Sequence, residues 1–185
     1  MLSDLRVLLI GAGTLGCAVA RALVGWGVQN ITFVDSGVVS PSNPTRQCLY
    51  SWKEAMGRNR MKATLAAEEL KAINPAINSH GVVFEIPMPD HVVQGVMEKE
   101  EMERGVEEKV SRLCDLIDTH DVVFLLTDSR ESRWLPSLLC CIARKLCINI
   151  ALGGDSFLIQ RYGLGTEVYA KEGLKQFKSL HTLLS

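Results

Sequence analysis

The sequence has almost no net charge and no long apolar run. Its 20 Lys and Arg residues are offset by 21 Asp and Glu residues, so the formal net charge is −1 and no overall positive field favours nucleic-acid binding. The longest apolar stretches, such as 122–126, are far too short to span a bilayer. Residues 1–6 lack a basic region followed by an apolar one. We therefore expect no secretory signal, and we expect the cytoplasm as the compartment.

No Cys-x-x-Cys pair occurs among the six cysteines, and none of them has the spacing of a zinc ligand set. Because several lie in apolar stretches, we expect small buried hydrophobes in a reducing compartment rather than disulfides or metal ligands. Cys48, close to Arg46 in the sequence, is the one candidate for a reactive thiol. The six are Cys17, Cys48, Cys114, Cys140, Cys141 and Cys147.

The chain does contain short apolar runs that alternate with helical patterns. Its 185 residues, 47% of them hydrophobic, favour one globular domain. We predict strands over 6–10, 30–34, 78–86, 121–126, 147–151 and 157–161, and helices over 14–26, 60–73, 92–119 and 131–146, with Pro136 in the first turn of the last helix. The charges of 92–119 indicate a solvated face. This order predicts an α/β fold with a doubly wound, mostly parallel, Rossmann-like sheet.

A glycine turn, Gly11-Ala12-Gly13-Thr14-Leu15-Gly16, joins the first predicted strand to the first helix. In this G-x-G-x-x-G pattern Gly11 permits a tight turn, Gly13 lets the backbone approach a phosphate and Gly16 lets the helix pack closely. Asp35, 19 residues after Gly16, ends the second strand, where a carboxylate can accept from ribose hydroxyls. The pattern predicts nucleotide binding, but it does not separate NAD, FAD and ATP, and a glycine turn kept for packing alone is the alternative.

Cationic residues follow the turn and separate these nucleotides. Arg46 lies in the loop Ser42-Asn43-Pro44-Thr45-Arg46-Gln47, Lys62 lies near the start of the second long helix, and Asp128 follows a strand with Arg133 five residues later. Attack of a carboxylate on the α-phosphate of ATP builds charge on phosphate oxygens, and cations with a metal-binding carboxylate stabilise that charge. A nicotinamide site needs no such cations. The alternatives that involve no ligand are a surface ion pair for Arg46, a solvated position for Lys62 and a helix cap for Asp128.

With these residues the chain resembles the E1-like (ThiF/MoeB-type) activating enzymes. Four stretches are similar to the autophagy branch of that superfamily: GAGTLGCAVARALVGWGV, ITFVDSGVVSPSNPTRQCLY, HDVVFLLTDSRESRWLP and CINIALGGDSF. The resemblance implies that Gly11, Gly13, Gly16 and Asp35 hold the adenosine and ribose of ATP. It also implies that Asn43, Arg46 and Lys62 contact the phosphates, that Asp128 binds Mg²⁺, and that Arg46 and Asp128 support adenylation.

The resemblance also implies partners. The substrate would be the C-terminal glycine of a ubiquitin-like protein of the Atg8 and Atg12 kind, which passes through a cysteine thioester to an E2-like conjugating enzyme, and the family works as a homodimer. The chain departs from the family because the region of the catalytic cysteine, the zinc-binding Cys-x-x-Cys pairs and the large N-terminal domain of the autophagy members have no match in it. We therefore expect an adenylation domain over 1–163, a partly disordered tail over 164–185, and no thioester formation by this chain alone.

Two other functions remain open at this stage. A Rossmann-like half can persist as a non-catalytic nucleotide-binding or dimerisation module, and ATP binding without turnover would identify it. A nicotinamide oxidoreductase would instead prefer NADH to ATP.

Overall fold

The computed structural model describes residues 1–57, 60–88 and 99–162, with the backbone alone for 99–103. The longer elements are β1 (Arg6–Ile10), α1 (Thr14–Gly25), β2 (Asn30–Val34), α3 (Lys62–Ile73), β3 (Asn78–Val82), α4 (Lys99–Asp118), β4 (Val122–Leu125), α5 (Glu131–Ile142), β5 (Leu146–Leu152) and β6 (Phe157–Tyr162). Three short helical segments, η1 (Leu2–Asp4), η2 (Asn43–Thr45) and α2 (Trp52–Ala55), complete the described chain.

The strands form one sheet in the order β3-β2-β1-β4-β5-β6. Each neighbouring pair from β3 to β5 is parallel, and β6 runs antiparallel to β5 at the edge. This is the doubly wound, mostly parallel order predicted from the sequence, so the predicted fold class is confirmed. The bounds of β1 and β2 are those predicted.

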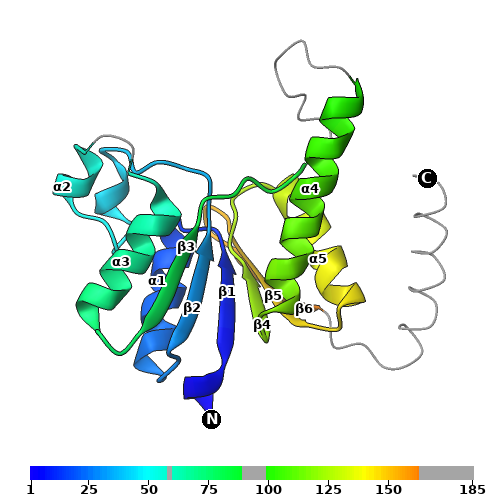
Figure 1. The fold of residues 1–185 in the computed structure, drawn as a ribbon. Helices are drawn as coiled ribbons and strands as arrows, with labels where there is room; N and C mark the ends of the chain where they lie inside the picture. The colour runs from blue at the N-terminus through cyan, green and yellow to red at the C-terminus, as the bar shows by residue number, and fades with distance from the viewer. Residues whose placement is uncertain (58–59, 89–98, 163–185) are drawn as a thin grey trace.

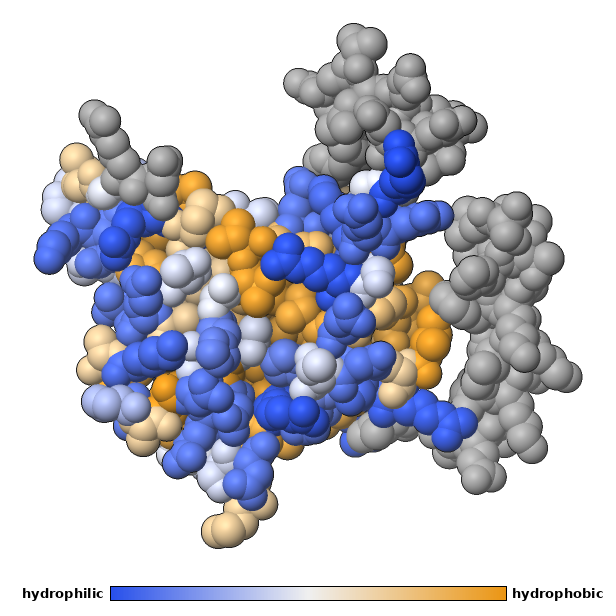
Figure 2. All heavy atoms as spheres, viewed as in Figure 1, coloured by the Kyte–Doolittle hydropathy of each residue, from blue (hydrophilic) through white to orange (hydrophobic). Residues whose placement is uncertain are grey.

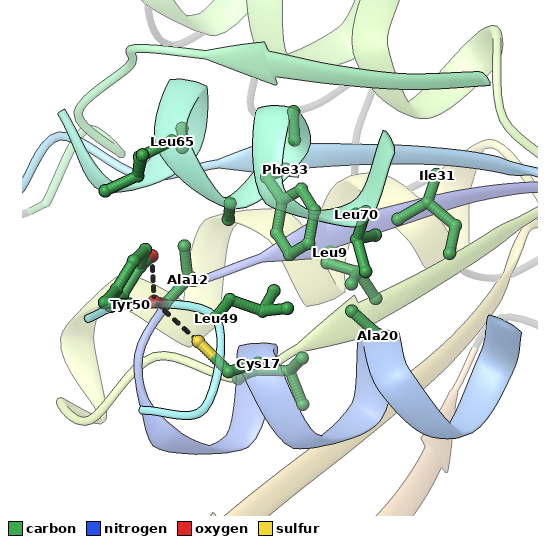
Figure 3. Packing of buried hydrophobic residues seen from close by; sticks show 14 of the residues in the cluster. Leu9, Ala12, Cys17, Ala20, Ile31, Phe33, Leu49, Tyr50, Leu65 and Leu70 are labelled. Atoms are coloured by element: carbon green, nitrogen blue, oxygen red, sulfur yellow. Dashed lines mark hydrogen bonds between the residues drawn. The ribbon is translucent and has the colours of Figure 1, made fainter. Parts of the chain in front are cut away.

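Helices cover both faces of the sheet: α1 and α3 lie on one side, α4 and α5 on the other (Figure 1). Successive residues of a strand point to opposite faces, so Val7 and Leu9 of β1 pack under α1 and α3, whereas Leu8 and Ile10 pack with α4 and α5. Figure 3 shows the first of these clusters, built around Phe33 and residues of α1 and α3. Burial on both faces is why these strands are continuous apolar runs.

The face seen in Figure 2 is mostly hydrophilic, with apolar residues exposed beside α5. Trp134, Leu138 and Ile142, four residues apart, form an exposed stripe along this helix. None of the described helices combines the length and the apolar character needed to cross a bilayer.

The first turn of α3 packs against β3 with no room for a side chain between them. A Cβ added to Gly81 of β3 would lie 2.4 Å from the carbonyl oxygen of Ala63 in α3. The absence of a side chain at Gly81 therefore allows the close approach of α3 to the sheet.

Most of the predicted element bounds differ from the structure by one or two residues, and the largest differences are in β3 and α5. β3 ends at Val82 rather than residue 86, because its partner β2 ends at Val34 and the ladder continues only into one long backbone hydrogen bond, from Phe84 N–H to Asp35 O at 3.4 Å, among the described residues. α5 ends at Ile142 rather than 146, and Pro136 lies in its second turn rather than its first. The start of the predicted helix over 92–119 and the tail over 164–185 lie outside the described residues.

The early end of α5 comes from a left-handed residue that is not glycine. Arg144 has φ +53, and Lys145 N–H donates to Cys140 O at 2.9 Å, the hydrogen bond of a Schellman cap. α1 ends in the same way, with Val28 N–H on Leu23 O, but there the left-handed residue is Gly27.

Replacing Arg144 with glycine should therefore stabilise the domain. The change removes the contact of Cβ with the backbone in the left-handed region, and we expect the free energy of unfolding to rise by about 0.5–1 kcal/mol. Urea unfolding with an unchanged m-value would measure it. Arg144→Ala is the control, because it keeps Cβ, and equal stability of the two variants would contradict the strain.

Candidate functional site

A cleft of about 580 Å³ lies at the carboxyl ends of β1, β2 and β4, where the strand order reverses. Ligands of doubly wound sheets bind at this position. The segments that follow the three strands line it: Gly11 and Gly13 after β1, Asp35 and Gly37 after β2, and Thr127 and Asp128 after β4. The volume is within the range of small-molecule sites.

The three glycines of the turn have different surroundings. Gly11 has φ +113, which side chains rarely adopt, and a Cβ on Gly16 would lie 2.1 Å from Gly11 O. Both are required by the backbone. At Gly13 an added Cβ would meet nothing closer than Gln47 Nε2 at 4.0 Å. Because the fold itself does not need glycine there, the open space at Gly13 fits the approach of a ligand to the first turn of α1.

Asp35 holds the glycine turn in place. Its Oδ2 accepts from Ala12 N–H at 2.8 Å, and its Oδ1 accepts from Gly37 N–H at 2.6 Å. The carboxylate is half-buried and lines the cleft. Each oxygen retains a second lone pair for a hydroxyl donor.

The loop after β2 divides into buried amides and an exposed cation. Asn43 is buried, and its Oδ1 accepts from Ser40 N–H at 3.0 Å, so this side chain shapes the loop and is not part of the cleft wall. Gln47 is buried in the wall, and its Oε1 has no hydrogen-bond partner among the described residues. Arg46 is exposed at the cleft, and among the residues that the structure describes its guanidinium donates only to its own loop, from Nη1 to Ser42 O at 3.1 Å.

Lys62 begins α3 beside this loop. Its backbone N–H donates to Gly37 O at 2.9 Å, and its methylene stem lies alongside Gly37. The ammonium has no ion pair or hydrogen bond with another described residue. A half-buried, unpaired cation at the wall of an open cleft is suited to an anionic ligand.

The third wall begins at Asp128. Its carboxylate has no partner among the described residues. The side-chain contact to the first turn of α5 comes instead from Ser129, whose Oγ accepts from Ser132 N–H at 3.4 Å, so the alternative of Asp128 as a helix cap is not supported. Arg133 also lines the cleft and donates from Nε to Thr127 O at 3.0 Å and from Nη2 to the same oxygen. Ser132 Oγ donates to Thr127 Oγ1 at 2.7 Å.

No cysteine contributes to the cleft wall. All six are free: Cys17, Cys140 and Cys147 are buried, Cys114 is half-buried, and Cys48 and Cys141 are exposed. Burial raises the pKa of Cys17 to about 11, so it stays an unreactive thiol. The expectation of buried cysteines therefore holds for three of them and fails for Cys48 and Cys141.

The described residues contain no cluster of three or more His, Cys, Asp or Glu side chains able to hold a metal ion. Asp35, Glu85 and Asp128 all line the cleft without forming such a cluster, and proteins commonly hold Mg²⁺ with one or two carboxylates while substrate phosphates and water supply its other ligands.

The remaining wall was not foreseen from the sequence. Phe84, Glu85, Ile86 and Met88, which follow β3, line the cleft, as do Ser129 and Ser132. Their position in the sequence, after a predicted strand, was the signal that could have placed the residues after β3 at the cleft, because segments that follow neighbouring parallel strands meet at one edge of the sheet. Asn43 and Gly16, in contrast, were expected at the ligand and lie behind the wall.

Comparison with known proteins identifies the family. A model of the ThiF family matches residues 1–176. The chain belongs to the ThiF family. Among curated relatives of this ThiF-family chain, the ubiquitin-like modifier-activating enzyme ATG7 of Rattus norvegicus is 50% identical over 162 residues, 87% of this chain and 23% of the relative. The ATG7 of Dictyostelium discoideum is 51% identical over 157 residues, 85% of this chain and 22% of the relative. The chain thus spans about a quarter of the length of these relatives.

Solved structures share the fold. The Escherichia coli tRNA N6-threonylcarbamoyladenosine dehydratase TcdA, in a complex with AMP, matches 80% of this ThiF-family chain and 50% of its own with a TM-score of 0.62 and 18% identity. E. coli MccB matches 87% of this chain and 38% of its own with a TM-score of 0.61 and 19% identity. At these identities the likeness shows the Rossmann-like fold alone.

Proposed function

We propose that this domain catalyses ATP-dependent adenylation of the C-terminal carboxylate of a ubiquitin-like protein. One observation carries the proposal: the cations Arg46, Lys62 and Arg133 and the unpaired carboxylate of Asp128 line the cleft that contains the open face of Gly13. A nicotinamide dinucleotide site needs one region that binds the anionic pyrophosphate, and it needs no further cations beside that region.

Each wall of the cleft has a part in this proposal. Asp35 accepts from the ribose hydroxyls, and the first turn of α1 donates N–H groups to a phosphate beside Gly13. Arg46 and Lys62 bind the outer phosphates, and Thr127 O holds Arg133 toward the same space. Gly11, Gly16 and Asn43 act indirectly: the glycines shape the turn, and Asn43 fixes the loop that carries Arg46.

The reaction is a displacement at phosphorus. A carboxylate oxygen of the substrate forms a bond to the α-phosphorus, the bond from that phosphorus to the bridging oxygen breaks, and pyrophosphate leaves with the electron pair. Arg46 and Lys62 stabilise the charge that builds on the departing phosphates. Mg²⁺ would neutralise further charge on these phosphates, and Asp128 is the residue that would hold it.

The names and bound nucleotides of similar proteins support this proposal. TcdA structures contain AMP or ATP, and ATG7 is named a ubiquitin-like modifier-activating enzyme. By that likeness the substrate is an autophagy ubiquitin-like protein of the Atg8 and Atg12 kind, the later acceptor is an E2-like enzyme, the assembly is a homodimer and the compartment is the cytoplasm.

ATP–pyrophosphate exchange tests the proposal. Exchange should require a ubiquitin-like protein that ends in glycine, and Asp128→Asn should lower its rate at least about 100-fold. Asp118→Asn is the matched control, because Asp118 is also exposed but ends α4, the helix that leads into the amino end of β4.

Each other result has a different meaning. Undiminished exchange by Asp128→Asn would refute the assigned role of this residue. ATP binding by the folded chain without any exchange would identify a nucleotide-binding module, and preference for NADH would indicate an oxidoreductase.

A further inference from the structure

Tyr50 joins two sides of the cleft from behind. Its ring is buried, and its hydroxyl lies 2.8 Å from Ala12 O in the glycine turn and 3.1 Å from Lys62 O in the first turn of α3. A phenol has one hydrogen, so the two carbonyls share one donor. Figure 3 shows Tyr50 and Cys17 converging on Ala12.

These contacts close a ring of hydrogen bonds around the site. From Ala12 N–H the ring passes to Asp35 Oδ2, from Asp35 Oδ1 to Gly37 N–H, and from Gly37 O to Lys62 N–H. Tyr50 completes it between Lys62 O and Ala12 O. The glycine turn, the acid and the start of α3 thus form one connected unit, and Tyr50 is its one side-chain hydroxyl.

The peptide plane turns this contact into an effect on the cleft. Ala12 C=O and Gly13 N–H belong to one trans peptide and point in opposite directions. Because Tyr50 holds the carbonyl on the buried side, the Gly13 N–H is directed away from it, and no described residue accepts from that N–H. Burial raises the pKa of Tyr50, so it remains a protonated donor at any physiological pH.

We propose that Tyr50 is a positioning residue for the phosphate site: its hydroxyl fixes the peptide of Ala12 and Gly13 relative to the backbone of Lys62, so that the Gly13 N–H and the side chain that extends from Lys62 serve the same anionic group. The inference rests on the proposed function that the cleft binds ATP. A tyrosine that only fills the core would affect stability and leave the discrimination between ATP and uncharged adenosine unchanged.

The test compares the affinities of ATP and adenosine for wild type and Tyr50→Phe by titration calorimetry at 15 °C, with folding checked by circular dichroism. Phenylalanine keeps the ring and removes the hydroxyl. We expect the Kd of ATP to rise about tenfold and the Kd of adenosine to stay the same, so their ratio changes. Tyr162→Phe is the matched control, because the Tyr162 hydroxyl donates to Gln160 Oε1 at 2.5 Å on β6, outside the ring.

The outcomes separate the two proposals. Equal ATP affinity of wild type and Tyr50→Phe would overturn the positioning role and leave ATP binding intact, whereas no ATP binding by wild type would overturn both. If the Tyr50→Phe chain does not fold, hydrogen exchange of the wild-type protein tests the proposal instead. ATP should then slow the exchange of Ala12, Gly37 and Lys62 N–H together, and protection of the glycine turn without Lys62 would overturn the coupling.

Discussion

Gly16→Ala is expected to lower the free energy of unfolding by about 3–5 kcal/mol. An added Cβ would lie 2.1 Å from Gly11 O, a backbone atom that cannot rotate away, so α1 would have to move off the end of β1. Total stabilities of about 5–15 kcal/mol make this a large fraction of the whole. Urea unfolding followed by far-ultraviolet circular dichroism would measure the change.

The control for this change lies on the same helix. Gly25 ends α1, and a Cβ there would meet nothing within 4 Å, so Gly25→Ala should be neutral or stabilise by up to about 1 kcal/mol. A Gly16→Ala protein as stable as wild type would show that the turn can move at little cost, and the packing role of Gly16 would then be wrong.

Lys62→Met is expected to leave the fold intact and to reduce ATP–pyrophosphate exchange about 100-fold. Methionine preserves the apolar stem that lies over Gly37, and the ammonium it removes has no partner among the described residues. The substitution removes a positive charge beside the phosphates of ATP. The KM for ATP should therefore rise and the maximal rate should fall. Steady-state exchange at varied ATP concentration separates these two parameters.

Lys71→Met serves as the comparison, because Lys71 is exposed in the last turn of α3, at the far end of the helix. It removes the same charge from the same helix and should exchange at the wild-type rate. Equal losses in the two variants would mean that net charge acts from a distance, and a wild-type rate for Lys62→Met would remove Lys62 from the site.

The first half of the fold was predictable because local signals agree with the tertiary structure. β1 and β2 are apolar on both faces and end at glycine or aspartate, which marks their bounds. The second half depends on partners that a local pattern does not contain. β3 ends where β2 ends, and α5 ends at a left-handed arginine that no sequence rule selects.

The site shows the same division. Gly11, Gly13, Asp35, Arg46, Lys62 and Asp128 were predicted and line one cleft. The glycines and the two aspartates follow strand ends, whereas Arg46 lies in the long loop after β2 and Lys62 opens α3, whose first N–H donates to Gly37 O beside the end of β2. Tyr50 could not be assigned a role in advance. Its contacts are to backbone carbonyls 38 and 12 residues away, and main-chain partners leave no trace in the amino-acid sequence.

Gly81 has a consequence for how substitutions accumulate in this domain over evolution. Any side chain there would collide with the first turn of α3, so selection should retain glycine at this position as strictly as in the glycine turn. Yet Gly81 is absent from the cleft wall. An invariant glycine at position 81 would record the packing of a helix on a sheet edge, and it would carry no information about the ligand.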